Sequence, residues 1–288
     1  MKQFEGARIL TLSTTPIADV TKHYSPEGAA VEAVLADLGK DTAILSIADL
    51  AGSDQFHSGG LEATRLLIQR AGIKAEDRVL DIGGAFGGPA RVLAHEIGCQ
   101  VTVVDLVEDY CRVGQKLTER TGLTDRVTFQ QGNALDLPFD AGSFDVVWTQ
   151  HSSMNIANKA ALYAQIHRVL RVGGRLALHE VTAGSGEPLH FPVPFAWTEA
   201  TSFLLAPDTF RETVTKAGFG ELAWADLTDW TTAWFHERQN VLQTSSVAAN
   251  ALGLIRLLGP DAGLMTRNFA INVQQGRVRA VQGVFERL

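Results

Sequence analysis

The stretch that decides the fold is VLDIGGAFGG, residues 79–88. It begins as an apolar run interrupted only by Asp81, which is typical of a buried parallel strand. The run then enters a glycine-rich turn, where Gly83, Gly87 and Gly88 permit tight bends and close approach of the backbone to a ligand. In a doubly wound sheet, ligands bind where a strand passes into the next helix. The stretch therefore predicts the first strand and the ligand-binding turn of an α/β fold.

Around this turn the sequence alternates short β-rich runs with amphipathic runs. Repeated alternation of this kind predicts a mostly parallel sheet covered by helices on both faces. The predicted strands are 77–82, 100–105, 126–131, 144–150, 174–181, 220–227 and 278–287, and the predicted helices are 61–72, 88–97, 107–121, 157–170, 231–258 and 261–275, with another after Pro207. We therefore expect an α/β, doubly wound, Rossmann-like domain.

The chain divides into three predicted parts. Residues 1–60 lack a strand pattern and contain a capped helix start, so we expect an N-terminal helical cap with a helix at 27–38. Residues 61–183 form the Rossmann-like core. Residues 184–288 supply a lid insertion, C-terminal helices and the last two strands, and the Gly/Pro-rich stretch 182–197 marks where regular structure breaks.

Composition restricts the class of partner. The 288 residues are 45% hydrophobic and 20% charged, as in ordinary globular proteins, and the net charge of -7 argues against nucleic acid as the main ligand. No apolar run is long enough to span a membrane, and the N-terminus lacks a secretory signal pattern, so we expect a cytoplasmic protein without a membrane partner. Cys99 and Cys111 lack metal-ligand spacing and are expected to be reduced, and we expect no metal site.

Asp105 ends the second predicted strand, about 20 residues after Gly83. A carboxylate at this position accepts hydrogen bonds from the ribose hydroxyls of an adenosine cofactor. Two such cofactors compete, a nicotinamide dinucleotide and S-adenosylmethionine. Asp81 precedes the glycine turn and would repel a pyrophosphate, but it suits a ligand with an ammonium and a sulfonium group. The residues therefore favour the cationic ligand.

Together these motifs resemble those of the class I S-adenosylmethionine-dependent methyltransferases. The glycine loop at 81–88 matches the first family motif, and Asp105 matches the acid of the second. GNALDLPFDAGSFDVVW at 132–148 matches the third motif, and RVLRVGGRLALHE at 168–180 matches the segment that precedes and includes the fifth strand. The resemblance covers residues 55–183 and implies a seven-stranded sheet with an antiparallel last strand.

The resemblance also implies a set of cofactor contacts. The implied cofactor-binding residues are Tyr24, Asp81, Gly83, Gly84, Ala85, Gly87, Asp105, Leu106, Asn133, Ala134 and Gln150. Leu106, Asn133 and Ala134 would contact the adenine, whereas Tyr24 would offer its hydroxyl to the cofactor carboxylate or close the pocket with its ring. Two residues depart from the family pattern. Ala85 replaces the usual glycine and narrows the space beside the methionine part, and Asn133 replaces the common aspartate that accepts from the adenine amino group.

For the chemistry, the sequence places histidines near the carboxyl edge of the sheet. Methyl transfer requires the nucleophile and the methyl group to be held in line, with a base only where the nucleophile must lose a proton. His151, directly after the fourth strand, is the candidate catalytic base, although a histidine at a strand end is more often a packing residue. The candidate substrate-binding residues are His57, Met154, His179, Phe195 and Trp197.

Several alternatives remain open at this stage. DQFHSGGLEATR at 54–65, TQHSSMNI at 149–156 and FPVPFAW at 191–197 resemble small-molecule enzymes such as the sarcosine/dimethylglycine N-methyltransferases, the ubiquinone/menaquinone C-methyltransferases and sugar O-methyltransferases. We expect methylation of N or O in a small-molecule acceptor. The alternatives are C-methylation of a quinone-like ring, a cofactor-binding protein with another activity such as a cyclase, and a nicotinamide-dependent oxidoreductase.

Two further expectations concern packing. Arg91, in the helix after the glycine turn, is expected to form a surface ion pair. The lid aromatics, which include Trp230 and Trp234, are either lid core or a box around a methylated ammonium. Periodicity leaves open whether the helices of 231–275 pack on the core or on a partner chain in a homodimer.

Overall fold

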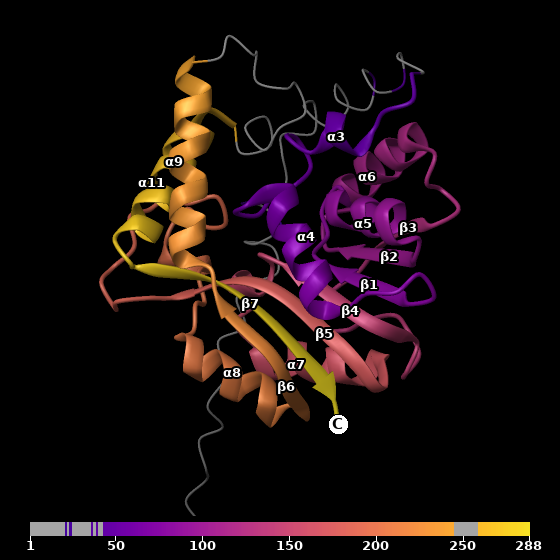
Figure 1. Ribbon diagram of the computed structural model, residues 1–288. Helices are drawn as coiled ribbons and strands as arrows, with labels where there is room; N and C mark the ends of the chain where they lie inside the picture. The colour runs from indigo at the N-terminus through magenta and orange to yellow at the C-terminus, as the bar shows by residue number, and fades with distance from the viewer. Residues whose placement is uncertain (1–20, 22, 25–35, 37–38, 40–42, 245–258) are drawn as a thin grey trace, which may run out of the picture.

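Figure 1 shows the computed structural model of the protein, which describes residues 43–244 and 259–288 together with Thr21, His23, Tyr24, Ala36 and Gly39. A seven-stranded sheet has the order β3-β2-β1-β4-β5-β7-β6. The strands are β1 (Arg78–Ile82), β2 (Gln100–Asp105), β3 (Val127–Gln131), β4 (Phe144–Gln150), β5 (Leu170–Ala183), β6 (Phe219–Asp226) and β7 (Val278–Arg287). β1 to β5 pair in parallel, whereas β7 runs antiparallel to both β5 and β6. The predicted fold class and the antiparallel last strand are confirmed.

Helices cover both faces of this sheet (Figure 1). They are α3 (Ile47–Leu50), α4 (Gly60–Ala71), α5 (Gly88–Val92), α6 (Glu108–Thr121), α7 (Lys159–Val169), α8 (Pro207–Lys216), α9 (Thr228–Thr244) and α11 (Ala262–Gln274). Successive strand residues point to opposite faces. Val79 and Trp148 pack on the face covered by α4 and α5, and Leu80 and Leu178 pack on the face covered by α7 and α8. Both faces are therefore buried, as the continuous apolar runs predict.

Beyond β5 the chain covers the carboxyl end of the sheet. Regular structure stops at Ala183, as predicted for 182–197, apart from short turns before Pro207. α9 and α11 pack on each other and on β7, next to the carboxyl end of β5 (Figure 1). α8 does not join this cover, because it packs beside α7 on the sheet face. Apart from Ala36, the predicted helix at 27–38 lies outside the described residues, and so does the second half of the one at 231–258.

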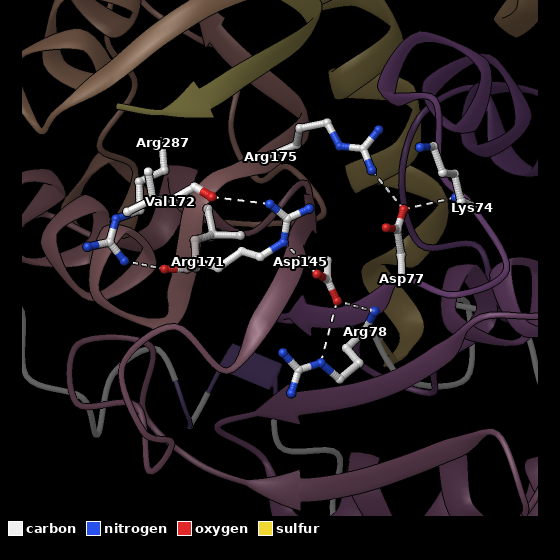
Figure 2. Close-up of polar contacts among 9 residues, drawn as sticks. Lys74, Asp77, Arg78, Asp145, Arg171, Val172, Arg175 and Arg287 are labelled. Atoms are coloured by element: carbon white, nitrogen blue, oxygen red, sulfur yellow. Dashed lines mark hydrogen bonds and ion pairs between the residues drawn. The ribbon is translucent and has the colours of Figure 1, made fainter.

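Ion pairs hold the opposite, amino-terminal end of the sheet (Figure 2). Asp145, at the start of β4, contacts Arg171 at 2.6 Å and Arg78 at 3.4 Å. Asp77, just before β1, contacts Arg175 of β5 at 2.7 Å. These pairs join β1, β4 and β5 at the end remote from the glycine turn, so their role is structural.

Candidate functional site

The glycine turn follows β1 and lies over a buried carboxyl group. The Asp81 side chain is 1% exposed, and its Oδ2 has no hydrogen-bond partner among the described residues. A Cβ added to Gly84 would lie 2.5 Å from that oxygen, so only glycine allows the backbone to pass so close. Burial raises the pKa of Asp81 to about 8, with a further contribution from Asp105. The start of the turn therefore holds an unpaired acid that would gain from a cationic partner.

Asp105 ends β2 beside this turn. Its Oδ2 accepts from the Ala85 amide and its Oδ1 from the Val107 amide, both at 2.9 Å. Burial raises the pKa of Asp105 to about 6, whereas the backbone hydrogen bonds lower it. Each oxygen retains a lone pair for a ligand hydroxyl. Asp105 thus holds the turn against β2. It also lies close enough to Asp81 to raise the pKa of Asp81, as expected if the two carboxyl groups border one site.

The departure at Ala85 has a visible backbone consequence. Ala85 has φ of 47°, in the left-handed region that disfavours side chains, at a cost of about 1 kcal/mol or more. The hydrogen bond from its amide to Asp105 helps to hold this conformation. A glycine at this position would relieve the strain, and the narrowing expected beside the methionine part of the cofactor stays a prediction.

The residues predicted to contact the adenine follow β2 and β3. The Gly132 amide donates to the Asp105 carbonyl at 2.9 Å, which brings Asn133 next to the end of β2. Asn133 Oδ1 accepts from the Leu135 amide at 2.9 Å and so closes its own turn. Leu106 and Ala134 are half-buried nearby. The departure from aspartate at Asn133 therefore preserves a side-chain oxygen that shapes the loop.

Tyr24 is half-buried above the turn. Its ring packs against an apolar group that includes Phe86, Val107 and Ala85. Its hydroxyl donates to Asn155 Oδ1 at 2.8 Å. Burial raises the pKa of Tyr24, and the carboxyl groups of Asp105 and Glu180 add to the effect. The hydroxyl proton of Tyr24 is donated to Asn155, and both roles expected for Tyr24 toward a cofactor stay predictions.

Three histidines meet at the carboxyl edge of β4 and β5. The rings of His151 and His179 stack with centroids 4.9 Å apart, and His57 lies 6.1 and 5.7 Å from them. Ser58 Oγ lies 3.2 Å from His151 Nε2 and 3.4 Å from His179 Nε2. The structure therefore brings together three predicted site residues from distant parts of the sequence.

These imidazoles are neutral at pH 7. Burial lowers the pKa of His57 to about 4 and that of His179 to about 3, and burial with two neighbouring histidines holds that of His151 well below its usual value. The pKa is lowered because desolvation penalises the imidazolium form. A base of such low pKa is weak, so the catalytic role of His151 stays a prediction.

Gln150, the last residue of β4, is buried between the two regions. Its Oε1 accepts from Trp148 Nε1 at 2.9 Å and from Thr64 Oγ1 at 3.3 Å. Its Nε2 is buried and has no partner among the described residues. The Gln150 amide therefore has a free donor where a cofactor contact is predicted.

Aromatic side chains adjoin the histidines. Phe269 of α11 lies between His151 (6.2 Å between ring centroids), Phe195 (5.9 Å) and Phe235 of α9 (5.8 Å). The predicted Phe195 and Met154 are buried in this group. Trp197 is 45% exposed and is not part of this buried group, and its ring contacts that of His23 with centroids 6.1 Å apart.

Sequence reasoning missed Phe269 and Phe235. Their helices were predicted, but periodicity does not reveal which ring each helix will meet. Of the two predicted aromatic residues Phe195 and Trp197, only Phe195 therefore joins the cluster beside His151. The other rings of this cluster are Phe235 of α9 and Phe269 of α11.

Two buried ionisable side chains, Glu180 and Lys159, were also missed. Glu180 of β5 is fully buried, and its Oε1 accepts from Thr149 Oγ1 and the Ser153 amide, both at 3.3 Å. Lys159 Nζ donates to the carbonyls of Ser153 and Ile156, both at 2.6 Å, and burial lowers the pKa of Lys159 to about 8. The sequence signal that could have revealed the burial of Glu180 was an acid inside the apolar end of a strand, LALHEV at 176–181.

The prediction of a surface position for Arg91 is wrong. Its side chain is fully buried and pairs with Asp54 at 2.7 Å. The same guanidinium donates to the Phe86 carbonyl at 2.7 Å and to Thr118 Oγ1 at 3.1 Å. Arg91 therefore ties the first turn of α5 to the segment before α4, and the cause is that α5 lies inside the fold.

The described residues also bear on metal binding, the state of the cysteines and membrane crossing. Among the described residues, no group of three His, Cys, Asp or Glu side chains is arranged to hold a metal ion. Cys99 and Cys111 are buried and free, and burial raises their pKa values to about 11 and about 12. Within the described ranges, no helix combines the length and apolar character needed to cross a bilayer.

Comparison with known proteins identifies the core. Residues 80–178 match the methyltransferase domain family. The chain is 27% identical over 172 residues to glycine/sarcosine/dimethylglycine N-methyltransferase of Actinopolyspora halophila, covering 60% of this chain and 30% of that protein. It is 29% identical over 186 residues to methyltransferase GfsG of Streptomyces halstedii, covering 64% and 67%.

Solved structures agree on the fold. Geranyl diphosphate C-methyltransferase from Streptomyces coelicolor A3(2) superposes with a TM-score of 0.67 at 19% identity, covering 96% of this chain and 99% of that one. The chain spans less than a third of the length of its Actinopolyspora relative, so the shared part is the domain. The chain therefore carries a class I S-adenosylmethionine-dependent methyltransferase domain and is a homologue of small-molecule methyltransferases.

Proposed function

We propose that the whole protein transfers a methyl group from S-adenosylmethionine to a nitrogen or oxygen atom of a small-molecule acceptor. One observation carries this proposal: the buried, unpartnered Oδ2 of Asp81 lies under the glycine turn beside Asp105. A cationic ligand would satisfy that oxygen and favour the ionised form of Asp81, whereas a diphosphate would be repelled by the Asp105 carboxylate and would oppose ionisation of Asp81. The residues present therefore fit this cofactor.

The residues have separate tasks in this proposal. Asp81 would pair with the ammonium group of the cofactor, and Asp105 would accept from the ribose hydroxyls. Leu106 and Asn133 would border the adenine. When bound, the cofactor supplies a methyl group on a positively charged sulfur. The chain would hold the acceptor in line with that methyl group and exclude water, which accounts for much of the rate in such displacements.

The acceptor side supports a neutral, partly apolar molecule. The stacked His151 and His179 are uncharged at pH 7, and Phe269, which packs in one apolar group with Phe195 and Met154, lies against the His151 ring. A neutral imidazole can accept a hydrogen bond from an acceptor N–H or O–H and orient its lone pair. His151 would perform this orientation, and it would take up the proton where the acceptor must lose one.

The test is to incubate the protein with S-adenosylmethionine and a panel of amines, phenols, sugar hydroxyls and quinone-like rings. We expect S-adenosylhomocysteine and an equimolar N- or O-methylated product, identified by mass spectrometry. A C-methylated product would show that the methyl group goes to carbon and not to nitrogen or oxygen. Tight binding of S-adenosylmethionine without turnover of any acceptor would support the alternative of another activity, and calorimetric binding of a nicotinamide dinucleotide alone would overturn the cofactor assignment.

The proposal also covers the division of the chain, the class of partner, the location and the oligomeric state. The division into a cap (1–60), a core (61–183) and a lid with C-terminal helices and strands (184–288) is proposed for the complete chain. The net charge of -7 supports a small acceptor over nucleic acid. We further propose a cytoplasmic location without membrane association and, for the helices around 231–275, a homodimer as the alternative to a monomer.

A further inference from the structure

The segment after β4 connects three parts of the molecule. Residues 151–156 begin at His151, which has φ of 50°, and continue to Asn155, which is 6% exposed. The Ser152 side chain donates to the Ile82 carbonyl at 3.2 Å, next to the glycine turn. The segment therefore touches the proposed cofactor site at one end and reaches Asn155 at the other.

Asn155 uses both ends of its carboxamide. Its Oδ1 accepts the hydroxyl proton of Tyr24 at 2.8 Å. Its Nδ2 donates to the carbonyls of Phe195 at 2.7 Å and Thr201 at 2.8 Å. Only a carboxamide offers an acceptor and two donors in this arrangement. One buried side chain thus joins Tyr24 to the backbone of the Gly/Pro-rich stretch.

The two partners of Asn155 border different halves of the site. Tyr24 packs against the apolar cluster that includes Phe86 and Val107, as Ala85 of the glycine turn does, and the Asp105 carboxyl group raises the pKa of the Tyr24 hydroxyl. Residues 191–203, here called the lid segment, carry Phe195 beside Phe269, whose ring in turn lies against His151. The Phe203 amide also donates to the Met154 carbonyl at 2.8 Å. A shift of Tyr24 would therefore be transmitted to the lid segment through Asn155.

We propose that Asn155 is a positioning residue that couples the closing of Tyr24 over the cofactor to the ordering of the lid segment over the acceptor. This inference rests on the proposed function. A bound cofactor would hold the Tyr24 ring in place, and the Asn155 amide would then fix the carbonyls of Phe195 and Thr201. The cofactor would accordingly bind first and raise the affinity for the acceptor, and the coupling would be reciprocal.

The experiment uses S-adenosylhomocysteine as the probe and requires no acceptor. Its affinity is measured by calorimetry, and hydrogen exchange of the lid-segment amides is followed with and without it. In the wild-type protein we expect the ligand to slow this exchange about five- to tenfold, the range expected from one or two strengthened hydrogen bonds. In Asn155→Asp the Tyr24 contact remains, but the carboxylate repels both lid carbonyls. The ligand should then bind within about threefold of wild type and change lid exchange by less than about twofold.

Two further variants separate coupling from simple damage. Tyr24→Phe removes the other end of the link, and the double variant should lose no more lid protection than either single variant. Asn158→Asp is the matched control, because Asn158 is exposed and its side-chain oxygen caps α7 in either form. The control should behave as wild type, and thermal unfolding checks that each variant is folded.

The outcomes separate the two proposals. If S-adenosylhomocysteine does not bind the wild-type protein, the proposed function fails. If it binds but leaves lid exchange unchanged, only the coupling fails. Full lid protection in Asn155→Asp, or additive losses from Tyr24→Phe and Asn155→Asp, would also overturn the role of Asn155.

Discussion

The two halves of the site differ in how they are built. The proposed cofactor half consists of the glycine turn and two carboxyl groups, Asp81 and Asp105, supplied by the ends of neighbouring strands β1 and β2. The proposed acceptor half consists of neutral histidines and aromatic rings that come from before α4, from β4 and β5, and from α9 and α11. One half is charged and local in sequence, whereas the other is neutral and assembled from distant segments.

This difference explains why the domain is recognisable while the acceptor is not. A cofactor with fixed charges requires particular residue types at fixed spacing, and such a pattern can be read from the chain. Acceptor recognition depends on the shape and polarity of surfaces that meet only in the folded protein. Each variant below therefore affects one half and should leave the other unchanged.

The largest effect is expected for Asp105→Ala. The change removes the proposed ribose acceptor and leaves the Ala85 and Val107 amides without their partner. Affinity for S-adenosylhomocysteine should fall by about 1 to 3 kcal/mol, or roughly 5- to 150-fold, in a calorimetric titration. Asp109→Ala, at an exposed ion pair in the first turn of α6, is the control. Unchanged affinity in Asp105→Ala would place the ribose elsewhere.

The next prediction concerns the proton of Asp81. With a pKa raised to about 8, Asp81 is mostly protonated at pH 7, and a cationic ligand favours its charged form and lowers that pKa. Binding of S-adenosylmethionine should therefore release up to about one proton, and affinity should rise as the pH rises from 6 towards 8. Calorimetry in two buffers of different ionisation enthalpy measures the release. The Asp81→Asn variant should show no proton release. Identical binding heats of the wild-type protein in both buffers would contradict a contact between Asp81 and the positively charged cofactor.

In the acceptor half, His151→Ala should slow turnover about tenfold or more without changing cofactor affinity. Because burial and two neighbouring histidines hold the pKa of His151 well below its usual value, the rate should show no His151-dependent fall between pH 7 and pH 6. Steady-state kinetics with an acceptor from the panel gives both quantities. His95→Ala, at an exposed position in the π-helical turn after α5, is the control. Turnover of His151→Ala at the wild-type rate would remove the residue from the mechanism.

The smallest effect is expected for Phe269→Leu. Leucine keeps the apolar character but loses the ring contacts with His151, Phe195 and Phe235, which are worth about 0.5 to 1.5 kcal/mol. KM for the acceptor should rise about two- to tenfold while cofactor affinity stays constant. Leu264→Ala, at an exposed position of the same helix, provides the comparison. An equal loss of cofactor affinity in Phe269→Leu would show that the two halves are not separate.

Most of the fold was predictable because its signals are local. The runs at 100–105, 144–150 and 278–287 were predicted with the observed bounds, since continuous apolar stretches between turns have few other stable arrangements. The prediction that Arg91 lies on the surface failed because an arginine is normally exposed. Only the packing of α5 against Asp54 and Thr118 makes the burial of Arg91 favourable. The same limit applies to Glu180 and Lys159, whose partners lie on other elements.

The sequence by itself determined the sheet, the glycine turn and the pair of acids, because strand period and motif spacing follow from covalent neighbours along the chain. Only the tertiary structure decided that His57, His151 and His179 meet and lose their affinity for protons, since that loss requires burial against one another. It also decided that Asn155 links Tyr24 to the lid segment, because hydrogen bonds between residues so distant in the chain depend on how the whole fold closes.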